Sequence, residues 1–181
     1  AITIPVVFFA LAIASMLAYA FAWIDFPGRN IAFIAVFALQ IVPLQMALVP
    51  LLSLFSRGLS IGDVTVFPPL ELRDMEHSFA TVWIAHTIFA LPLAVFLLHN
   101  FIAEIPSEVI EAARVDGAGP MRFFWDVLLP LSRTSIAALF VIQFIYGWNQ
   151  YLWPLLVTTD ESMYPVVMGI KRMISGGDAA N

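Results

Sequence analysis

The segment Glu111-Ala112-Ala113-Arg114-Val115-Asp116-Gly117 is a polar interruption in a chain dominated by long apolar runs. A short amphipathic stretch follows it and ends in Val127-Leu128-Leu129-Pro130. The apolar runs on either side are long enough to cross a bilayer, which takes about 20 helical residues. The interruption predicts a short helix that ends at a glycine and a second helix after it. Between membrane spans, such a polar segment predicts a docking surface for another protein.

The composition is that of a membrane protein. Of the 181 residues, 61% are hydrophobic and only 12% are charged, and the mean hydropathy is +0.92. Soluble domains carry about 25% charged residues. The net charge of −5 argues against a nucleic-acid partner. The absence of cysteine excludes disulfides, cysteine-based zinc sites and thiol catalysis.

Four uncharged apolar runs are predicted to span the membrane. They cover residues 2–24, 31–56, 79–98 and 134–159. At a rise of about 1.5 Å per residue, such runs reach about 30 Å or more as helices. We therefore predict an all-α, polytopic helical membrane protein that forms a single domain over residues 1–181. Because the chain opens inside an apolar run without the basic region of a signal peptide, we expect a fragment with both ends missing.

The first two runs carry different packing signals. Small residues between Ala10 and Ala20 make the first run suited to close helix packing in lipid. The second run contains Gln40, Pro43, Gln45 and Pro50. Such residues are tolerated where a neighbouring helix or a wet cavity satisfies the backbone groups they free. We predict a kinked helix that partly lines a solute path, with a kink held by packing alone as the alternative.

Polar groups are also present in the third and fourth runs. We expect His86, the titratable group within the third run, to donate a hydrogen bond to a neighbouring helix, with a proton relay as the alternative. In the fourth run, amides and aromatic rings cluster between Gln143 and Pro154. They form either a sugar-binding lining or an interfacial aromatic belt. The candidate pathway residues are Gln40, Gln45, Tyr146, Trp148, Asn149, Gln150 and Trp153.

The remaining segments are predicted to be loops. Residues 25–30 form a tight polar turn, residues 57–78 an exposed loop with a surface helix near 70–75, and residues 160–181 a further loop. The basic residues of these loops do not orient the chain, because each side of the membrane receives four of them. One side holds Arg29, Arg114, Arg122 and Arg133, and the other holds Arg57, Arg73, Lys171 and Arg172.

The loop between the third and fourth runs predicts two helices. Pro106 and Glu108 favour a helix start, and Gly117 favours a left-handed helix end. The second helix carries an apolar stripe made of Phe123, Phe124, Val127, Leu128 and Leu131. On the first helix, two alanines leave a low surface for a partner, and Glu111 beside them offers an ion pair to a partner arginine. An amphipathic helix resting on headgroups is the alternative, and it suits the second helix better.

This arrangement resembles the cytoplasmic loop of permeases of binding-protein-dependent ABC importers. Those permeases carry Glu-Ala-Ala, a glycine four residues after the last alanine, and then Ile-x-Leu-Pro. The matching residues here are Glu111, Ala112, Ala113, Gly117, Val127, Leu129 and Pro130, with Val127 in place of Ile as the departure. Together with Arg114, they are the residues that we assign to ATPase coupling.

The resemblance implies the following topology and partners. The four spans would be helices two to five of a six-helix type I permease in the bacterial inner membrane. The loop over residues 100–133 would be cytoplasmic, as would residues 25–30. Within that loop, residues 111–130 would form coupling helices that seat in a groove of a separate dimer of ATPase subunits. Further expected partners are a second permease subunit in a heterodimer, an extracytoplasmic substrate-binding protein and membrane lipid.

Resemblance to particular subfamilies points in two directions. The segments 122–125, 129–132 and 144–155 resemble permeases for sn-glycerol-3-phosphate, whereas residues 26–29 and 42–51 resemble permeases for α-glucosides and other oligosaccharides. A phosphate ester favours Arg, Lys or helix N-termini, and the predicted spans contain no Arg or Lys. Sugar hydroxyls favour amides and stacking aromatics. We expect sn-glycerol-3-phosphate or a related carbohydrate, with oligosaccharides as the alternative.

Other functional classes find less support. A secondary transporter needs an intramembrane ion site, yet the predicted spans contain no Asp or Glu. His86 and His99 lack a metalloprotease pattern, and no Gly-x-x-x-x-Gly-Lys-Ser/Thr sequence is present. We therefore expect no catalytic residue, metal site or cofactor in this chain, with ATP used by the partner. A non-pumping structural membrane subunit is the alternative from another class.

Overall fold

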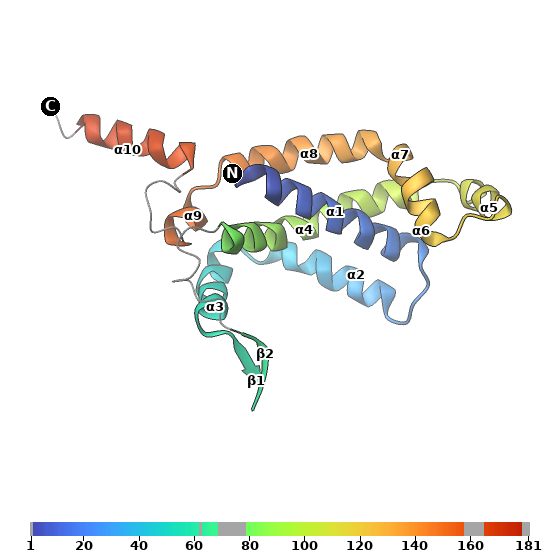
Figure 1. Ribbon diagram of the computed structural model, residues 1–181, viewed down its shortest axis with the longest axis horizontal. Coiled ribbons are helices and arrows are strands. Elements are labelled where there is room, and N and C mark those ends of the chain that lie inside the picture. The colour runs from blue at the N-terminus through green and yellow to red at the C-terminus, as the bar shows by residue number, and fades with distance from the viewer. Residues whose placement is uncertain (1, 62, 69–78, 158–164, 179–181) are drawn as a thin grey trace. The chain divides into compact units, whose positions relative to one another are not determined.

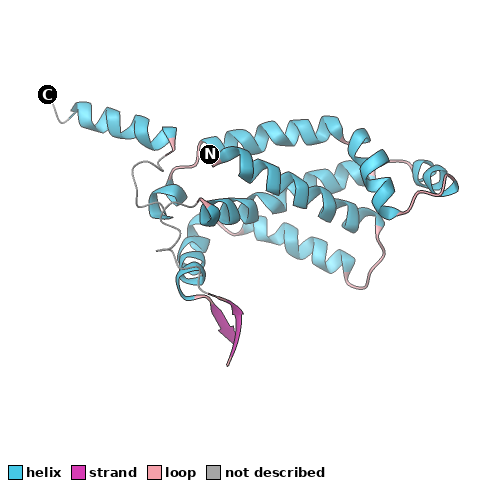
Figure 2. Cartoon of the chain, in the orientation of Figure 1, coloured by secondary structure: helices cyan, strands magenta, loops and turns pink. Residues whose placement is uncertain are grey.

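A computed structural model describes residues 2–61, 63–68, 79–157 and 165–178 (Figure 1). The described part is helical apart from one small hairpin, as Figure 2 shows. Its elements are α1 (Thr3–Trp23), α2 (Arg29–Ala38), the 3-10 turn η1 (Leu39–Ile41), α3 (Leu44–Arg57), β1 (Leu59–Ile61), β2 (Val64–Phe67), α4 (Ala80–Ala103), α5 (Ser107–Val115), α6 (Pro120–Phe123), the π-turn η2 (Phe124–Leu128), α7 (Leu129–Leu131), α8 (Arg133–Trp148), α9 (Leu152–Val157) and α10 (Val166–Asp178). The predicted all-α fold class is confirmed.

Two predicted spans are continuous helices. By length and composition, α1 and α4 are long and apolar enough to cross a membrane. Their bounds agree with the apolar runs 2–24 and 79–98, although α4 continues to Ala103. The described part holds up to four spans if each of two bent helix pairs counts as one. The two bent pairs join residues 29–41 to 46–57 and residues 120–131 to 133–148. The second pair begins within the predicted loop 100–133, so it matches the predicted fourth span, 134–159, only in part.

The second predicted span, residues 31–56, is broken into two helices. The first helix, α2, ends through η1, and α3 begins after Pro43, which has the extended backbone of an N-cap residue (φ −60°, ψ 136°). Proline cannot donate to the preceding turn, and it pushes the residue before it out of the helical region. The predicted kink is thus a complete break. Pro50, by contrast, lies within α3 without ending it.

The fourth predicted span, residues 134–159, is also broken, so the prediction of one continuous helix was wrong. Helix α8 ends at Trp148, and α9 begins at Leu152. The Asn149 side chain donates to the carbonyl of Ile145 at 2.9 Å, and the Gln150 side chain donates to that of Tyr146 at 3.3 Å. The Ile145 carbonyl also accepts from the Asn149 backbone amide at 3.1 Å, so the Gln150 side chain is the group that supplies a donor to a carbonyl of the last turn.

Two short elements lie in segments that we predicted to be loops. Strands β1 and β2 form an antiparallel hairpin in which Ile61 faces Val64. The surface helix predicted near residues 70–75 lies outside the described residues. Helix α10 replaces part of the loop predicted over residues 160–181. It buries Met168 and places the Lys171 ammonium 4.3 Å from the centre of the Tyr151 ring, a cation–π contact.

The packing divides the chain into two compact units, which we describe separately. Unit 1 comprises Ala1–Val7, Val42–Phe89 and Phe144–Asn181, and unit 2 comprises Phe8–Ile41 and Ala90–Gln143. Three boundaries fall within α1, α4 and α8, and the fourth follows η1. The prediction of a single domain over residues 1–181 stays a prediction.

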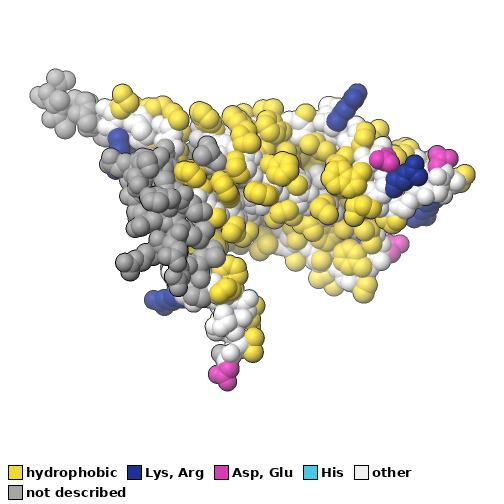
Figure 3. All heavy atoms as spheres, in the orientation of Figure 1, with side chains coloured by type: hydrophobic (Ala, Val, Ile, Leu, Met, Phe, Trp, Pro, Cys, Tyr) yellow, Lys and Arg dark blue, Asp and Glu magenta, His cyan; other side chains and the backbone are white. Residues whose placement is uncertain are grey.

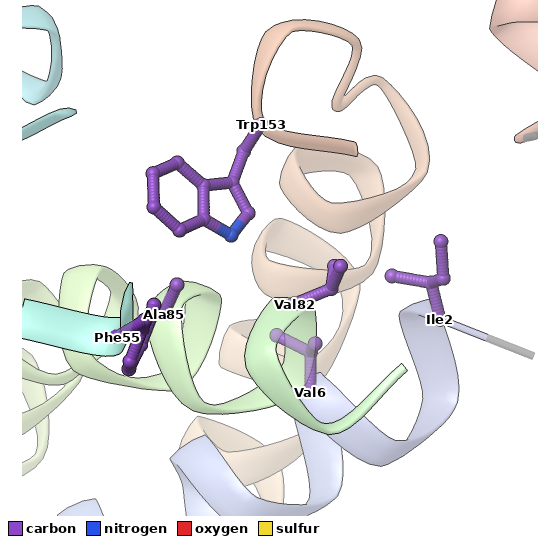
Figure 4. Packing of buried hydrophobic residues seen from close by; sticks show 6 residues of the cluster. All are labelled: Ile2, Val6, Phe55, Val82, Ala85 and Trp153. Atoms are coloured by element: carbon purple, nitrogen blue, oxygen red, sulfur yellow. The ribbon is translucent and has the colours of Figure 1, made fainter. Parts of the chain in front are cut away.

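Unit 1 has a hydrophobic core built from five segments. Figure 4 shows its buried members, which are Ile2, Val6, Phe55, Val82, Ala85 and Trp153. Trp153 is only 1% exposed, and its ring meets Phe55 and Phe89 edge to face with centroids 6.2 and 6.4 Å apart. Such aromatic pairs add about 0.5–1.5 kcal/mol beyond their buried area. The core thereby fixes α9 against α3 and α4.

Unit 2 packs around the small residues of α1. Ala10, Ala14 and Ala18 recur at intervals of four and are fully buried, which confirms the predicted close packing of this helix. An aromatic series joins α1, α2 and α4: Phe33 contacts Phe21 at 5.7 Å and His99 at 4.1 Å between ring centroids. The buried Gln143 side chain of α8 donates to the carbonyl of Ala90 at 3.2 Å.

Many large apolar side chains point outward, as expected for helices that face lipid. In the view of Figure 3, hydrophobic side chains cover the surface over the long helices, whereas charged side chains gather around α5 and the loop beyond it. Ile31, Ile34, Ile41 and Val49 are among those more than 60% exposed. Soluble monomers rarely expose apolar surface on this scale. The charged loop is therefore the part of unit 2 that is suited to water and to a soluble partner.

Candidate functional site

Helix α5 begins as the sequence predicted. Pro106 is its N-cap residue, with φ −59° and ψ 140°, and Glu108 lies in the first turn. Arg114 lies in the last turn, so charges of favourable sign stand at both ends of the helix dipole. These features define a short helix of nine residues with fixed ends. Short isolated helices are marginal in water, so its end contacts matter for its stability.

The C-terminal end of α5 is a Schellman motif centred on Gly117. Gly117 has φ +75°, the left-handed conformation that was predicted for it. The Ala118 amide donates to the Ala113 carbonyl at 2.9 Å, and the Gly117 amide donates to the Arg114 carbonyl at 3.0 Å. These are the two bonds that define the motif. They lock the direction in which the chain leaves α5.

The second helix of the loop is helical from Pro120 to Leu131 but contains a π-turn. Gly119 caps it and Pro120 takes the first position. The Leu129 amide donates to the Phe124 carbonyl, five residues back rather than four. Pro130 has no amide hydrogen, and in a regular helix its ring would clash with the carbonyl four residues back. The wider turn accommodates this proline within the helix.

This second helix is anchored on α1 through an aromatic contact. Phe123 and Phe124 are buried, and their rings lie 6.2 and 5.5 Å from that of Tyr19. The Tyr19 hydroxyl donates to the Pro120 carbonyl at 3.2 Å. Arg114 lies close enough to Tyr19 to interact with it electrostatically. The sequence analysis missed Tyr19, because no periodic signal links a residue of α1 to a loop so far along the chain.

The apolar stripe predicted on the second helix is buried only in part. Phe123, Phe124 and Leu128 are buried and Val127 is half-buried, but Leu131 is 48% exposed. The helix therefore uses most of its apolar face within unit 2. This internal use differs from the alternative in which the helix rests that face on headgroups.

The outer face of α5 is the free surface of the loop. Glu111, Ala112 and Arg114 are exposed, and Val115 is 88% exposed. Ala113 is buried, so the prediction that both alanines form the docking surface is corrected to Ala112 alone. The side of α5 that carries Ala113 packs against the rest of unit 2, whereas Ala112 lies on the exposed side. The remaining assigned residues, Leu129 and Pro130, are half-buried and exposed.

The charges on the outer face of α5 are available to a partner. Among the described residues, the two ion pairs are Arg29–Asp25 at 2.9 Å and Arg122–Asp126 at 3.3 Å, both within single turns. Exposed pairs of this kind contribute at most about 1 kcal/mol. Neither pair uses Glu111. Its carboxylate is therefore free to pair with a guanidinium from outside the chain.

The candidate pathway residues do not form one lining. Trp153 belongs to the hydrophobic core of unit 1, so its assignment to the pathway is corrected. Trp148 is 48% exposed and stacks on Phe144 at 5.7 Å, as a residue of an interfacial belt would. Gln40 and Asn149 are exposed. The side chain of Gln45 lies outside the described part.

Three polar side chains of unit 1 do come together. His86 is buried, and its ring centroid lies 6.4 Å from that of Tyr146. The Gln150 side chain approaches both rings. Its Nδ1 pairs with the Val82 carbonyl of its own helix at 2.9 Å, and the Gln150 side chain at the end of α8 interacts with the same ring. The expected bond from His86 to a neighbouring helix stays a prediction.

The chain belongs to the family of inner membrane components of binding-protein-dependent transport systems. The family model matches residues 2–176. This match confirms the resemblance inferred from the Glu111–Pro130 loop. It also confirms the predicted localisation, since the family description and the apolar helices together define a multi-pass protein of the cytoplasmic membrane.

The chain is similar to several sn-glycerol-3-phosphate transport system permease proteins UgpE. It is 41% identical over 174 residues to that of Yersinia enterocolitica and 42% identical over 168 residues to that of Salmonella choleraesuis, which cover 93% of this chain. The protein of Pectobacterium atrosepticum is 41% identical over 170 residues, or 94% of this chain. The chain spans about half, 54%, of the length of each relative. Their names describe transport permeases and not enzymes.

Proposed function

We propose that this chain is part of the membrane-spanning subunit of an ATP-driven importer for sn-glycerol-3-phosphate. The observation that carries the coupling role is the outer face of α5, where Glu111 and Ala112 are exposed beside a Schellman end at Gly117. The substrate is supported by the relatives at 41–42% identity, which are sn-glycerol-3-phosphate permeases by name. ATP hydrolysis belongs to a separate ATPase, and this chain itself holds no cofactor.

The proposed partners follow from the same surfaces and from the family. A dimer of ATPase subunits takes the coupling helices over residues 111–130, which lie within the cytoplasmic loop 100–133. A second permease subunit completes a heterodimeric pathway, and an extracytoplasmic binding protein delivers the solute, as the family description suggests. Lipid covers the exposed apolar side chains of the spans.

The geometry of unit 2 supports a lever mechanism for coupling. A push on α5 is passed to the second helix of the loop through the fixed turn at Gly117. That helix is held on α1 by Tyr19, and it runs into α8 through a bend of 73° after Leu131. Movement of the ATPases therefore acts on two helices at once. Rigid elements of this kind transmit displacement between alternative arrangements of a transporter.

A second candidate substrate class is α-glucosides and other oligosaccharides. Tyr146, Asn149 and Gln150, at the broken end of α8, offer the hydroxyl-binding groups that such solutes need. The two classes share these hydroxyl contacts but differ in the phosphate. The same uptake experiment separates them.

The test uses the full-length protein with its partners in proteoliposomes. We expect the intact importer to take up labelled sn-glycerol-3-phosphate and not maltose. Glu111→Lys should reduce both uptake and substrate-stimulated ATPase activity by about 10-fold or more, because losing one charge pair and burying a like charge costs about 2–5 kcal/mol. The measurements are initial uptake rates and phosphate release.

The matched control is Glu104→Lys. Glu104 is exposed in the turn between α4 and α5, so the charge change is the same but lies off the outer face of α5. We expect uptake within about 2-fold of wild type for this control, as is usual for isolated surface substitutions. Wild-type-like coupling in Glu111→Lys would remove the docking role and leave the structural-subunit alternative. Uptake of maltose instead would move the substrate to the oligosaccharide class.

A further inference from the structure

One imidazole nitrogen of the buried His86 accepts no hydrogen bond of standard geometry from the described residues, although the Gln150 side chain lies near the ring. His86 is 1% exposed and lies on α4 directly after Ala85, a member of the unit 1 core. Its Nδ1 is 2.9 Å from the Val82 carbonyl oxygen, whereas no hydrogen bond of standard geometry reaches its Nε2 from the described residues. A buried polar atom left in this way costs about 1–3 kcal/mol. It calls for a function.

The partner of Nδ1 fixes the chemistry of Nε2. A carbonyl oxygen can only accept, so Nδ1 carries the hydrogen of that bond. In a neutral imidazole the other nitrogen is then a bare acceptor. Nε2 therefore presents a lone pair, and it is suited to an incoming O–H group rather than to an anion.

The residues that approach His86 supply further groups of the same kind. Tyr146 and Gln150 are half-buried, at the end of α8 where the helix breaks. One N–H of Gln150 donates to the Tyr146 carbonyl at 3.3 Å, and its amide group also lies within reach of the His86 ring and the Tyr146 hydroxyl. The Tyr146 hydroxyl can both donate and accept. Together the three side chains offer mostly acceptors and no positive charge.

We propose that His86, Tyr146 and Gln150 form a binding site for the hydroxyl groups of the transported solute. This inference rests on the proposed function and divides the recognition of the solute in two. A phosphate dianion would face lone pairs at this site and is repelled from it. The phosphate is bound by cationic groups outside these spans, in the second permease subunit or the binding protein. This chain thus binds the neutral, hydroxyl-bearing part of the solute.

The test measures discrimination between solutes that differ by one hydroxyl. The complete importer in proteoliposomes is supplied with sn-glycerol-3-phosphate and with its two deoxy analogues, each of which lacks one hydroxyl. We expect His86→Phe to lower kcat/KM for the parent compound by about 3–10-fold, the value of one hydrogen bond. For the analogue that lacks the recognised hydroxyl, kcat/KM should differ by less than 2-fold between His86→Phe and wild type. The wild-type preference for the parent then disappears.

Two further variants separate binding from folding. Gln150→Leu should also reduce the preference for sn-glycerol-3-phosphate over the deoxy analogue. In the double variant, the loss of kcat/KM should be smaller than the two single losses combined, because both side chains bind one ligand. Gln143→Leu is the control, since Gln143 is an equally buried amide whose bond to Ala90 is internal. It should lower uptake of all three solutes alike.

An equal loss for all three solutes in both His86→Phe and Gln150→Leu would overturn the inference and leave a structural role. A wild-type importer that takes up none of the three phosphates gives a different pattern. It would overturn the proposed substrate, and the assignment of this site to that solute with it.

Discussion

Gly117 holds a backbone conformation that other residues adopt only at a cost. Its φ is +75°, and a Cβ added there would meet nothing within 4 Å, so the penalty for a side chain is purely conformational. For an L-residue that penalty is about 1–2 kcal/mol. The turn at Gly117 sets how α5 leaves toward the second helix, and this small penalty therefore acts on the coupling surface.

We expect Gly117→Ala to loosen the end of α5 and weaken coupling. The Ala118 amide, which now donates to Ala113, should exchange its hydrogen about 5–30-fold faster, as 1–2 kcal/mol of local stability implies. Substrate-stimulated ATPase activity of the full importer should fall in parallel. Hydrogen exchange by mass spectrometry and phosphate release provide the two measurements.

Gly119→Ala serves as the control for this substitution. Gly119 also has open space around it, but its φ of −72° suits any residue. The added methyl group should therefore leave both measurements unchanged. Equal effects of the two substitutions would show that bulk in the loop, and not the left-handed turn, governs coupling.

At the scale of residues, the sequence predicts what depends on local chemistry. Gly117 is the glycine at a helix end, which predicts its left-handed conformation. The charges of Glu108 and Arg114 suit the helix dipole, which predicts their places in the first and last turns of α5. The burial of Ala113 and the pairing of His86 with its own helix depend on three-dimensional packing. No pattern within one helix distinguishes Ala112 from Ala113 before the neighbouring elements are known.

At the scale of elements, α1 shows how a helix in lipid uses small residues. Its buried face within unit 2 carries Ala10, Ala14 and Ala18 beside Leu11 and Phe21, whereas its exposed face carries Ile4, Phe8 and Met16. Large apolar side chains gain no hydrophobic free energy when they move from lipid into a helix contact. Helix contacts are therefore stabilised by the close packing that small residues allow. The two faces of α1 should therefore respond differently to the same substitution.

We expect Ala14→Leu to destabilise the full-length protein and Ala12→Leu to be tolerated. Ala14 is fully buried within unit 2, so three extra carbon atoms overpack the contact at a cost of about 1–3 kcal/mol. Ala12 is exposed on the same helix. Thermal unfolding in detergent should show a lower Tm for Ala14→Leu alone. A lower Tm for Ala12→Leu alone would assign the packing face of α1 to the wrong side.

Apolar length predicts where spans lie but not where they break. The runs that became α1 and α4 contain no local competitor strong enough to end the helix, and they were predicted well. The breaks after Ile41 and Trp148 come from single residues, Pro43 and the amide pair Asn149–Gln150. A proline or an amide can also lie inside a continuous helix when tertiary contacts satisfy the backbone groups that lose their helical partners. Pro50, which lies within α3, is an example. The sequence alone does not separate these outcomes.

At the scale of the whole molecule, sidedness depends on whether the broken segments cross the bilayer. The described helices are compatible with two spans or, if each bent pair crosses, with four. If α2 and α3 together form one crossing, Asn30 and Asp116 lie on one side and Ser60 on the other. If that pair instead enters and leaves on one side, Ser60 joins Asn30 and Asp116 moves opposite.

The absence of cysteine from the chain allows a direct measurement. We expect Ser60→Cys to react with a membrane-impermeant maleimide in intact spheroplasts, and Asn30→Cys and Asp116→Cys to react only after permeabilisation. All three positions are exposed, so access within the folded chain does not limit the reaction. The test is made in the full-length protein after removal of any cysteine beyond this chain.

The pattern of labelling separates the two arrangements. In the other arrangement, Ser60→Cys and Asn30→Cys are both protected in intact spheroplasts, whereas Asp116→Cys reacts. That pattern would show that α2 and α3 form a re-entrant pair. The coupling face of α5 would then lie outside the cell, where no ATP-driven partner can reach it. The expected pattern instead places the exposed Glu111 in the cytoplasm and the β1–β2 hairpin outside, because a single crossing by α4 separates them.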